Sequence, residues 1–182
     1  IKKMTLIDKP KIFSFILRRE SKNNSNQHDN NRDAGPISNY LESLEYIINK
    51  DPNNVILIDD KKYLEINLPR VINVREFNNE LYNLANIFML KNSEFCVIQH
   101  SGPLHLANIL KTPVVVSDFL PLWQGSCGKN DIFVPKNFFS KSENKIISLK
   151  KVLTDFVDLF YGNYDKFKDI KVLPSNKYDI KM

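Results

Sequence analysis

Apolar residues in this chain fall into short continuous runs that alternate with longer segments in which apolar positions recur at helical spacing. The continuous runs predict buried strands at 12–17, 55–58, 71–74, 95–98, 114–116 and 132–134. The segments with helical spacing predict helices at 37–50, 78–91, 104–110 and 147–161. Strands that are apolar at successive positions are typical of a parallel sheet with both faces covered. We therefore expect an α/β fold, a Rossmann-like doubly wound parallel sheet of about five to six strands.

Three of the predicted helices have an apolar side that we expect to pack on the sheet. In the helix at 37–50, this side consists of Tyr40, Leu41, Leu44, Ile47 and Ile48. In the helix at 78–91, it consists of Leu81, Leu84, Ala85, Phe88 and Met89. In the helix at 147–161, it consists of Leu149, Val152, Leu153, Phe156, Leu159 and Phe160. Residues 20–36 are rich in Asn, Asp and Ser, which predicts a long exposed loop.

Length and composition fit one domain. The 182 residues are 42% hydrophobic and 26% charged, which is typical of a globular protein with a core of useful size. We expect one Rossmann-like domain over residues 1–161, followed by a polar C-terminal tail over residues 162–182. Because the chain begins at Ile1 and leads almost directly into a strand, we expect it to be a piece of a longer protein.

Charge and cysteine content narrow the function classes. The net charge of +5 is spread along the chain without a basic-aromatic module, so we expect no nucleic-acid partner, while weak attraction to anionic lipid or to a phosphorylated substrate stays open. No apolar stretch approaches the roughly 20 residues that cross a bilayer, and no signal-peptide pattern is present. Cys96 lies in an apolar run and Cys127 in a polar loop, so we expect two free thiols in a reducing cytoplasm. No histidines and carboxylates have metal-ligand spacing, so we expect no metal.

Polar residues follow four of the predicted strands directly. In an open parallel sheet, ligands bind beyond the carboxyl ends of the strands, so these residues are the candidates for a binding site. They are Arg18 and Arg19, Asp59 and Asp60, Gln99, His100, Ser101 and Gly102, and Ser117 and Asp118.

The turn after the fourth strand has the composition of an anion site. Ser101 can cap the following helix, Gly102 lets a ligand approach the backbone, and Pro103 suits the first helical turn. The free amides and the positive end of the helix dipole there would attract a phosphate. The same three residues are also simply a good helix start, and the spacing alone does not decide between the two interpretations.

Other candidates have a structural alternative as well. Arg18 or Arg19 can neutralise a phosphate, but strand alternation directs only one of them to the ligand, and either can instead form a salt bridge with Asp59 or Asp60. His105 lies among apolar residues and is either a ligand contact or a core residue. His100 precedes the turn and can face the crevice.

The segment from Phe95 to Ala107, with its Ser-Gly-Pro turn and His105, and the following Thr-Pro-Val-Val from Thr112 resemble a motif of heptosyltransferase-like GT-B glycosyltransferases. That motif has Asp where this chain has His100. A broader resemblance, over residues 12–155, is to the C-terminal domain of a group of surface-carbohydrate glycosyltransferases. It rests on Arg32-Asp33-Ala34, Asn39-Tyr40-Leu41, Val55 to Asp60, the Ser-Gly-Pro turn and Asp131 to Lys136.

The resemblance implies an enzyme of which this chain is an incomplete part, the nucleotide-sugar-binding half of a GT-B fold. It implies that the donor diphosphate lies against Ser101, Gly102, Pro103 and His105. Arg18 or Arg19 would neutralise the phosphates, and Asp59 or Asp60 would approach the nucleoside. The implied partners are an N-terminal domain outside this chain and a carbohydrate or lipid-linked acceptor, with no cofactor beyond the donor itself. The implied location is the cytoplasm, at or near the inner face of the membrane.

Two other functions remain open at this stage. One is a non-catalytic nucleotide-binding or interaction module that keeps the GT-B type of fold. The other is a sugar-nucleotide epimerase of the same fold. A dinucleotide oxidoreductase is not expected, because no GxGxxG follows the first strand.

Overall fold

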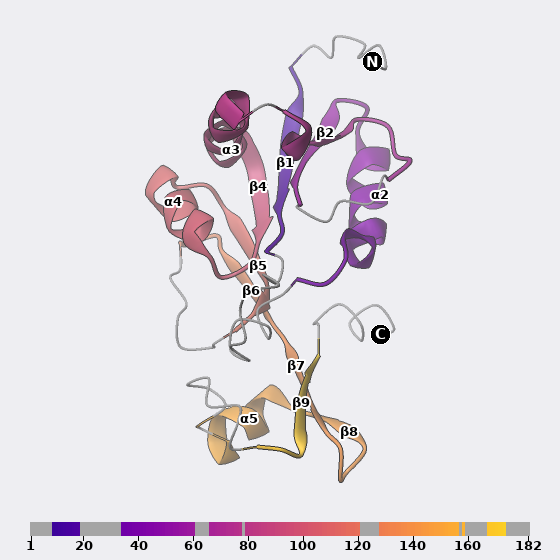
Figure 1. The fold of residues 1–182 in the computed structure, drawn as a ribbon, viewed down its shortest axis with the longest axis vertical. Coiled ribbons are helices and arrows are strands. Elements are labelled where there is room, and N and C mark those ends of the chain that lie inside the picture. The colour runs from indigo at the N-terminus through magenta and orange to yellow at the C-terminus, as the bar shows by residue number, and fades with distance from the viewer. Residues whose placement is uncertain are drawn as a thin grey trace.

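The computed structural model describes residues 9–18, 34–60, 66–77, 79–120, 128–156, 158 and 167–173. Its main feature is a six-stranded parallel sheet with the order β3-β2-β1-β4-β5-β6 (Figure 1). The strands are β1 (Lys11–Ile16), β2 (Asn54–Asp59), β3 (Val71–Asn73), β4 (Ser93–Ile98), β5 (Val114–Phe119) and β6 (Ile132–Pro135). The expected α/β, Rossmann-like fold is confirmed, including the sixth strand.

Helices cover both faces of this sheet. On one face lie the 3-10 turn η1 (Ile37–Tyr40) and α2 (Leu41–Lys50), which connect β1 to β2. On the other face lie α3 (Asn79–Asn92) and α4 (Gly102–Leu110), as Figure 1 shows. A second 3-10 turn, η2 (Val74–Glu76), leads from β3 into α3. None of the helices in the described part of the chain has the length and apolar character needed to cross a membrane.

Alternate residues of each strand supply two separate cores. Side chains such as Phe15, Ile56 and Ile58 pack with α2 on one face. Cys96, Ile98 and their neighbours pack with α3 and α4 on the other. Burial raises the pKa of the Cys96 thiol to about 11, so this cysteine is an inert core residue, as its sequence context predicts. Cys127 lies outside the described residues.

The predicted inner face of α3 is confirmed for Ala85 and Met89 and wrong for its other three residues. Leu81, Leu84 and Phe88 are half or more exposed, whereas Met89 is fully buried. The side of α3 that packs toward the sheet includes Tyr82, Ala85, Met89 and Leu90. Because α3 has apolar residues on several sides, spacing alone could not select which stripe faces the sheet. Leu41 of α2 is also exposed at 36%, although the rest of its predicted stripe is buried.

A small antiparallel sheet follows the main one and was not expected from the sequence. It has the order β8-β7-β9 and is built from β7 (Asn137–Ser140), β8 (Lys145–Ile147) and β9 (Ile170–Leu173). The helix beside it, α5 (Leu149–Asp155), starts after β8 and is shorter than the predicted 147–161. Val152 of α5 is buried as predicted, but Leu149 and Leu153 are exposed. The predicted positions Leu159 and Phe160 lie outside the described residues.

Asp169, which directly precedes β9, forms hydrogen bonds with the end of β7 and with the turn between β7 and β8. Its carboxylate accepts hydrogen bonds from the Ser142 hydroxyl at 2.7 Å, from the Ser140 hydroxyl at 2.9 Å and from the Ser142 amide at 2.9 Å. The hydrogen bond from Ser142, followed by that from Ser140, lowers the pKa of Asp169 from its ordinary value of 3.8. The ionised carboxylate therefore stabilises this end of the small sheet.

The pKa of Asp169 is lower in the folded state than in the unfolded state. Its contribution to the free energy of unfolding is therefore complete above the ordinary aspartate pKa and is lost as the pH falls through the folded-state pKa. Asp169→Asn should abolish this pH dependence and increase hydrogen exchange at the amides of Ser142 and Lys141 at the upper end of the measured pH range, where the native carboxylate is ionised. The measurement is amide exchange by NMR between about pH 3 and pH 6. Asp155→Asn, on exposed α5, is the control. Unchanged exchange in Asp169→Asn would contradict this role.

Candidate functional site

The candidate site lies at the carboxyl edge of the main sheet, where β1 and β4 are neighbours. The strand order reverses direction at this pair, which makes it the topological switch point where ligands bind in such sheets. Arg18 follows β1, and Gln99, His100 and Ser101 follow β4. The fold therefore brings together four of the residues that the sequence analysis selected from strand ends.

The side chain of Gln99 connects several elements at this edge through hydrogen bonds. It is 1% exposed, and the oxygen of its side-chain amide accepts a hydrogen bond from the backbone N–H of Arg18 at 2.7 Å. Its side-chain amide donates to the hydroxyl of Ser117 at 2.7 Å and to that of Tyr40 at 3.2 Å. One buried side chain thus connects the ends of β1, β4 and β5 to the turn that opens α2.

A buried charge pair extends this network. The Tyr40 hydroxyl donates to Asp118 Oδ2 at 3.1 Å, and Lys136 Nζ lies 4.0 Å from Asp118 Oδ1. Both charged side chains are at most 5% exposed. Asp118 also adopts a left-handed backbone conformation with φ of +51°, which costs energy for any residue other than glycine. A positive φ and a buried charge pair therefore occur together at the end of β5.

The turn after β4 leaves the start of α4 open. Ser101 occupies the N-cap position, but its hydroxyl donates to the carbonyl of Gln99 at 3.0 Å and does not cap a helix amide. Gly102 is the first helical residue and is exposed, and a Cβ built on it would meet nothing within 4 Å. Pro103 follows it within the first turn, as predicted. Apart from its neighbours in the chain, none of the described residues comes within 4 Å of that Cβ position at the helix start.

Of the two arginines that follow β1, the structure describes Arg18. Arg18 is partly buried at the end of β1, and its backbone is held by Gln99 beside the start of α4. Arg19 lies outside the described residues, as do Arg32 and Asp33 of the resemblance. Both arginines remain candidates to accompany an anion at α4, and the structure gives the position of Arg18.

Asp59 has a structural partner that the sequence analysis missed. Its carboxylate accepts hydrogen bonds from the Arg75 guanidinium of η2 and from the Tyr82 hydroxyl of α3, the latter at 2.9 Å. The Arg75 guanidinium lies 4.3 Å from the centre of the Tyr82 ring. Burial raises the pKa of the Tyr82 hydroxyl, which keeps it a donor. The Asp59 ion pair is thus with Arg75, whereas the sequence analysis weighed Arg18 and Arg19 as partners. Asp60 is 1% exposed.

The two histidines lie close together. The rings of His100 and His105 are 6.1 Å apart in an edge-to-face arrangement, and His100 also contacts Phe119. His100 is buried, whereas His105 is exposed on the first turns of α4. The interpretation of His105 as a core residue is therefore wrong, and its ring can meet a ligand at the helix start. Among the residues that the structure describes, no three His, Cys, Asp or Glu side chains cluster to hold a metal.

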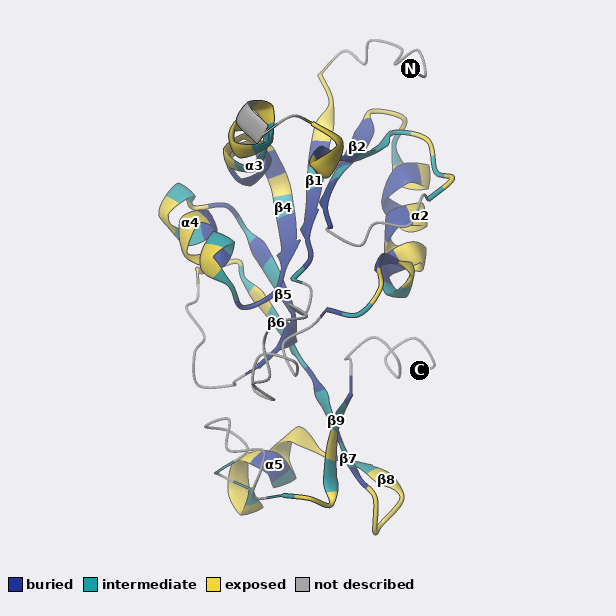
Figure 2. Cartoon of the chain, viewed as in Figure 1, coloured by how far each residue is buried: buried dark blue, intermediate teal, exposed yellow. Residues whose placement is uncertain are grey.

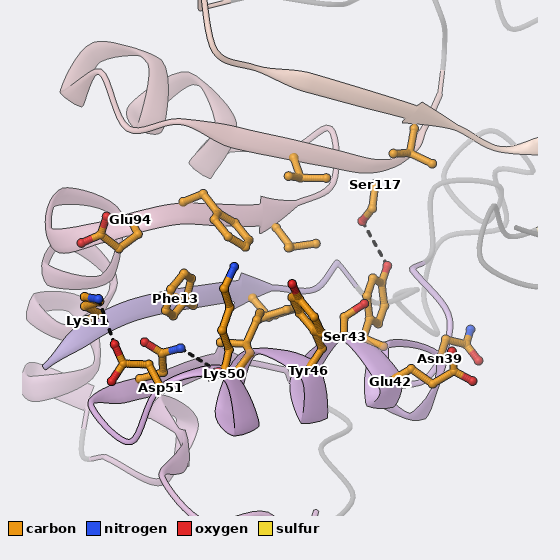
Figure 3. Close-up of a pocket in the computed structure, with 18 residues that line it drawn as sticks. Lys11, Phe13, Asn39, Glu42, Ser43, Tyr46, Lys50, Asp51, Glu94 and Ser117 are labelled. Atoms are coloured by element: carbon orange, nitrogen blue, oxygen red, sulfur yellow. Dashed lines mark hydrogen bonds and ion pairs between the residues drawn. The ribbon is translucent and has the colours of Figure 1, made fainter. Parts of the chain in front are cut away.

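A hollow of about 1140 Å³ lies between α2 and the face of the main sheet that α2 covers (Figure 3). Its floor consists mainly of apolar side chains from β1, β4, β5 and β6, among them Phe13, Phe95 and Val115. Lys11 and Asp51 form an ion pair of 2.9 Å at its far end, and Ser117 lines the end near the carboxyl edge. Its apolar lining does not suit a diphosphate, so the anion candidate remains the start of α4.

Searches of protein-family models, of curated proteins and of solved structures found no match to this chain. The resemblance to GT-B glycosyltransferases therefore rests on the motif residues themselves.

Sequence reasoning also missed several residues that shape this edge. Tyr40 was assigned to an apolar stripe, and its hydroxyl turns out to join Gln99, Ser117 and Asp118. Lys136, Arg75 and Tyr82 gave no local signal, because each of them meets its partner through tertiary contacts only.

Gln99→Ala tests the network. The substitution removes the acceptor of the Arg18 amide and the donor to Ser117 within a buried region, which should lower the free energy of unfolding by about 2 kcal/mol. Urea denaturation followed by circular dichroism measures the loss. Asn49→Ala, at an exposed position of α2, is the matched control and should change little. Equal stability of the two variants would show that Gln99 does not hold this edge.

Proposed function

We propose that this chain is the donor-binding domain of a GT-B glycosyltransferase and that it binds the diphosphate of a nucleotide sugar at the start of α4. The observation that carries the proposal is the open helix start at Gly102, located at the switch point of a Rossmann-like sheet. Its sequence, Ser101-Gly102-Pro103 with His105, is the part of the chain that resembles the family motif. Transfer of the sugar to a surface-carbohydrate acceptor is the activity that this resemblance implies.

Physical chemistry favours an anion at this position. The positive end of the α4 dipole and the amide of Gly102 point away from the helix, and Ser101 does not occupy them with its hydroxyl. Arg18 would add a full positive charge from the neighbouring strand end. In sugar transfer, negative charge builds on the departing diphosphate, so these groups would stabilise the transition state more than the bound donor.

The carboxylates described at this edge are poorly suited to act as the general base. Asp59, Asp60 and Asp118 are at most 5% exposed, and Asp59 is paired with Arg75. A base that takes the acceptor proton must reach that proton directly or through one water. In the proposed architecture, the base and the acceptor site come from the N-terminal domain. A cytoplasmic location, with the acceptor at the inner face of the membrane, belongs to the same proposal and rests on the resemblance alone.

Gly102→Val tests the anion site directly. Apart from its neighbours in the chain, the Cβ of a side chain at this position meets no atom of the described residues within 4 Å, so the fold should persist while the space at the helix start is filled. Arg18→Ala should weaken binding through the loss of one charge. Calorimetry with UDP-, GDP-, ADP- and CMP-sugars should identify a donor, and each variant should bind it at least about tenfold more weakly, equal to about 1.4 kcal/mol.

Lys150→Ala removes one positive charge from exposed α5 and is the control for net charge. It should leave donor affinity unchanged. Failure of all four donor classes to bind the wild-type chain would favour the non-catalytic module instead. Unchanged affinity in both Gly102→Val and Arg18→Ala would refute the proposed site.

The isolated chain should bind a donor and transfer little or no sugar, because the proposed base lies in another domain. Release of free nucleotide from the donor, measured with and without candidate acceptors, checks this expectation. Robust transfer by the 182 residues alone would contradict it. Release of nucleotide without any acceptor would instead indicate an epimerase.

A further inference from the structure

The outer sides of α3 and α4 form an exposed apolar surface, which we call the α3–α4 face. It comprises six large side chains, namely Leu81, Leu84, Ile87, Phe88, Leu106 and Ile109. Their exposed fractions range from 36% for Leu106 to 76% for Ile109. The two helices pack side by side on the same face of the sheet, and Figure 2 shows exposed positions on their outward sides. The six side chains therefore belong to one surface.

This surface lacks charge to an unusual degree. The chain is 26% charged, yet neither the segment from Leu81 to Leu90 nor the whole of α4 contains an Asp, Glu, Lys or Arg. Exposed helix faces of monomeric proteins are normally polar, and a helix that is apolar on all sides is normally buried on all sides. Depletion of charged residues is instead typical of the centre of a protein interface.

The size of the α3–α4 face also suits an interface. Given their exposed fractions, the six side chains present roughly 600 Å² of apolar surface, which is at the upper end of the largest patches found on monomers. Two such faces packed together would remove roughly 1200 Å² from water, which is the lower limit for specific, stable protein interfaces.

We propose that the α3–α4 face is covered by the same face of a second copy of this chain, related by a twofold axis. Both helices run from the carboxyl edge of the sheet toward its amino edge, so a twofold axis perpendicular to them would stack two antiparallel helix pairs between the two sheets. The four helices would then bury their apolar sides against one another. This interface is independent of the proposed donor site.

Charges at the rim agree with this antiparallel arrangement. Lys91 and Lys111 are exposed at the C-terminal ends of α3 and α4, and Glu76 is exposed just before the start of α3. An antiparallel pair brings the C-terminal end of one helix beside the N-terminal end of its partner, so cations of one copy would face the acid of the other. No Lys or Arg lies between Leu81 and Leu90 or within α4. This disfavours a membrane surface as the partner, since membrane-bound helices usually carry many Lys and Arg.

The arrangement leaves the candidate site accessible. Ile109 lies at the far end of α4 from Gly102, and the antiparallel pairing directs the carboxyl edges of the two sheets away from each other. A dimer would therefore present two open donor sites at opposite ends.

Sedimentation velocity of the full chain between about 1 and 100 µM tests the proposal, since interfaces of this size commonly give dimers in that range. The wild-type chain should show a concentration-dependent dimer. Leu84→Glu and Ile109→Lys, each at a position more than 60% exposed, should retain the wild-type circular dichroism spectrum. Each should raise the dimer dissociation constant at least about hundredfold, because each would bury a charge.

Leu153→Glu is the matched control, because it places the same charge at an exposed apolar position of α5 and should leave the dimer intact. The proposal is overturned by a wild-type chain that stays monomeric at the highest concentration. It is also overturned by dimers that survive both α3–α4 substitutions, or that dissociate equally in Leu153→Glu. A monomer that co-sediments with phosphatidylglycerol vesicles would assign the face to a membrane and would equally overturn it.

Discussion

The hydrogen bonds of Gln99 are the constraint on which the carboxyl edge of this protein depends. They join the ends of three parallel strands to the start of the first helix. The backbone ladder fixes the register of β1 against β4 as far as Ile16 and Ile98, and Gln99 extends the connection beyond these strand ends. This buried side chain, whose polar partners are satisfied, holds the backbone of Arg18 beside the end of β4 before any ligand arrives.

The same edge separates buried negative charge from exposed hydrogen-bond donors. Asp59 and Asp118 are enclosed with cationic partners, so the carboxylates contribute little field to the crevice. Gly102 and His105 are exposed in front of a helix dipole of positive sign. This division is what favours the proposed anion site at this edge. It is the physical basis on which the proposed binding of a diphosphate rests, whichever nucleoside and sugar the donor carries.

The helices cover the two faces of the main sheet to different extents. Beside α2 the sheet retains an open apolar hollow, whereas on the opposite face the helices cover the strands and present apolar side chains outward. Apolar surface left in water costs roughly 25 cal/mol per Å² relative to burial. Surfaces of this kind are therefore more easily understood in a larger assembly than in an isolated domain, which agrees with both the proposed dimer and the proposed second domain.

The sequence alone determined the parallel sheet, its six strands and the candidate turn at Ser101, because continuous apolar runs and a Ser-Gly-Pro helix start are local patterns. It did not determine which side of α3 packs inward, since a helix with apolar residues on several sides has no single preferred face in its spacing. The small sheet, the pairing of Asp59 with Arg75 and the contacts of Tyr40 were likewise decided by the tertiary structure. Each of these joins residues far apart in the chain, and no local pattern specifies which distant partner a strand, a carboxylate or a hydroxyl will meet.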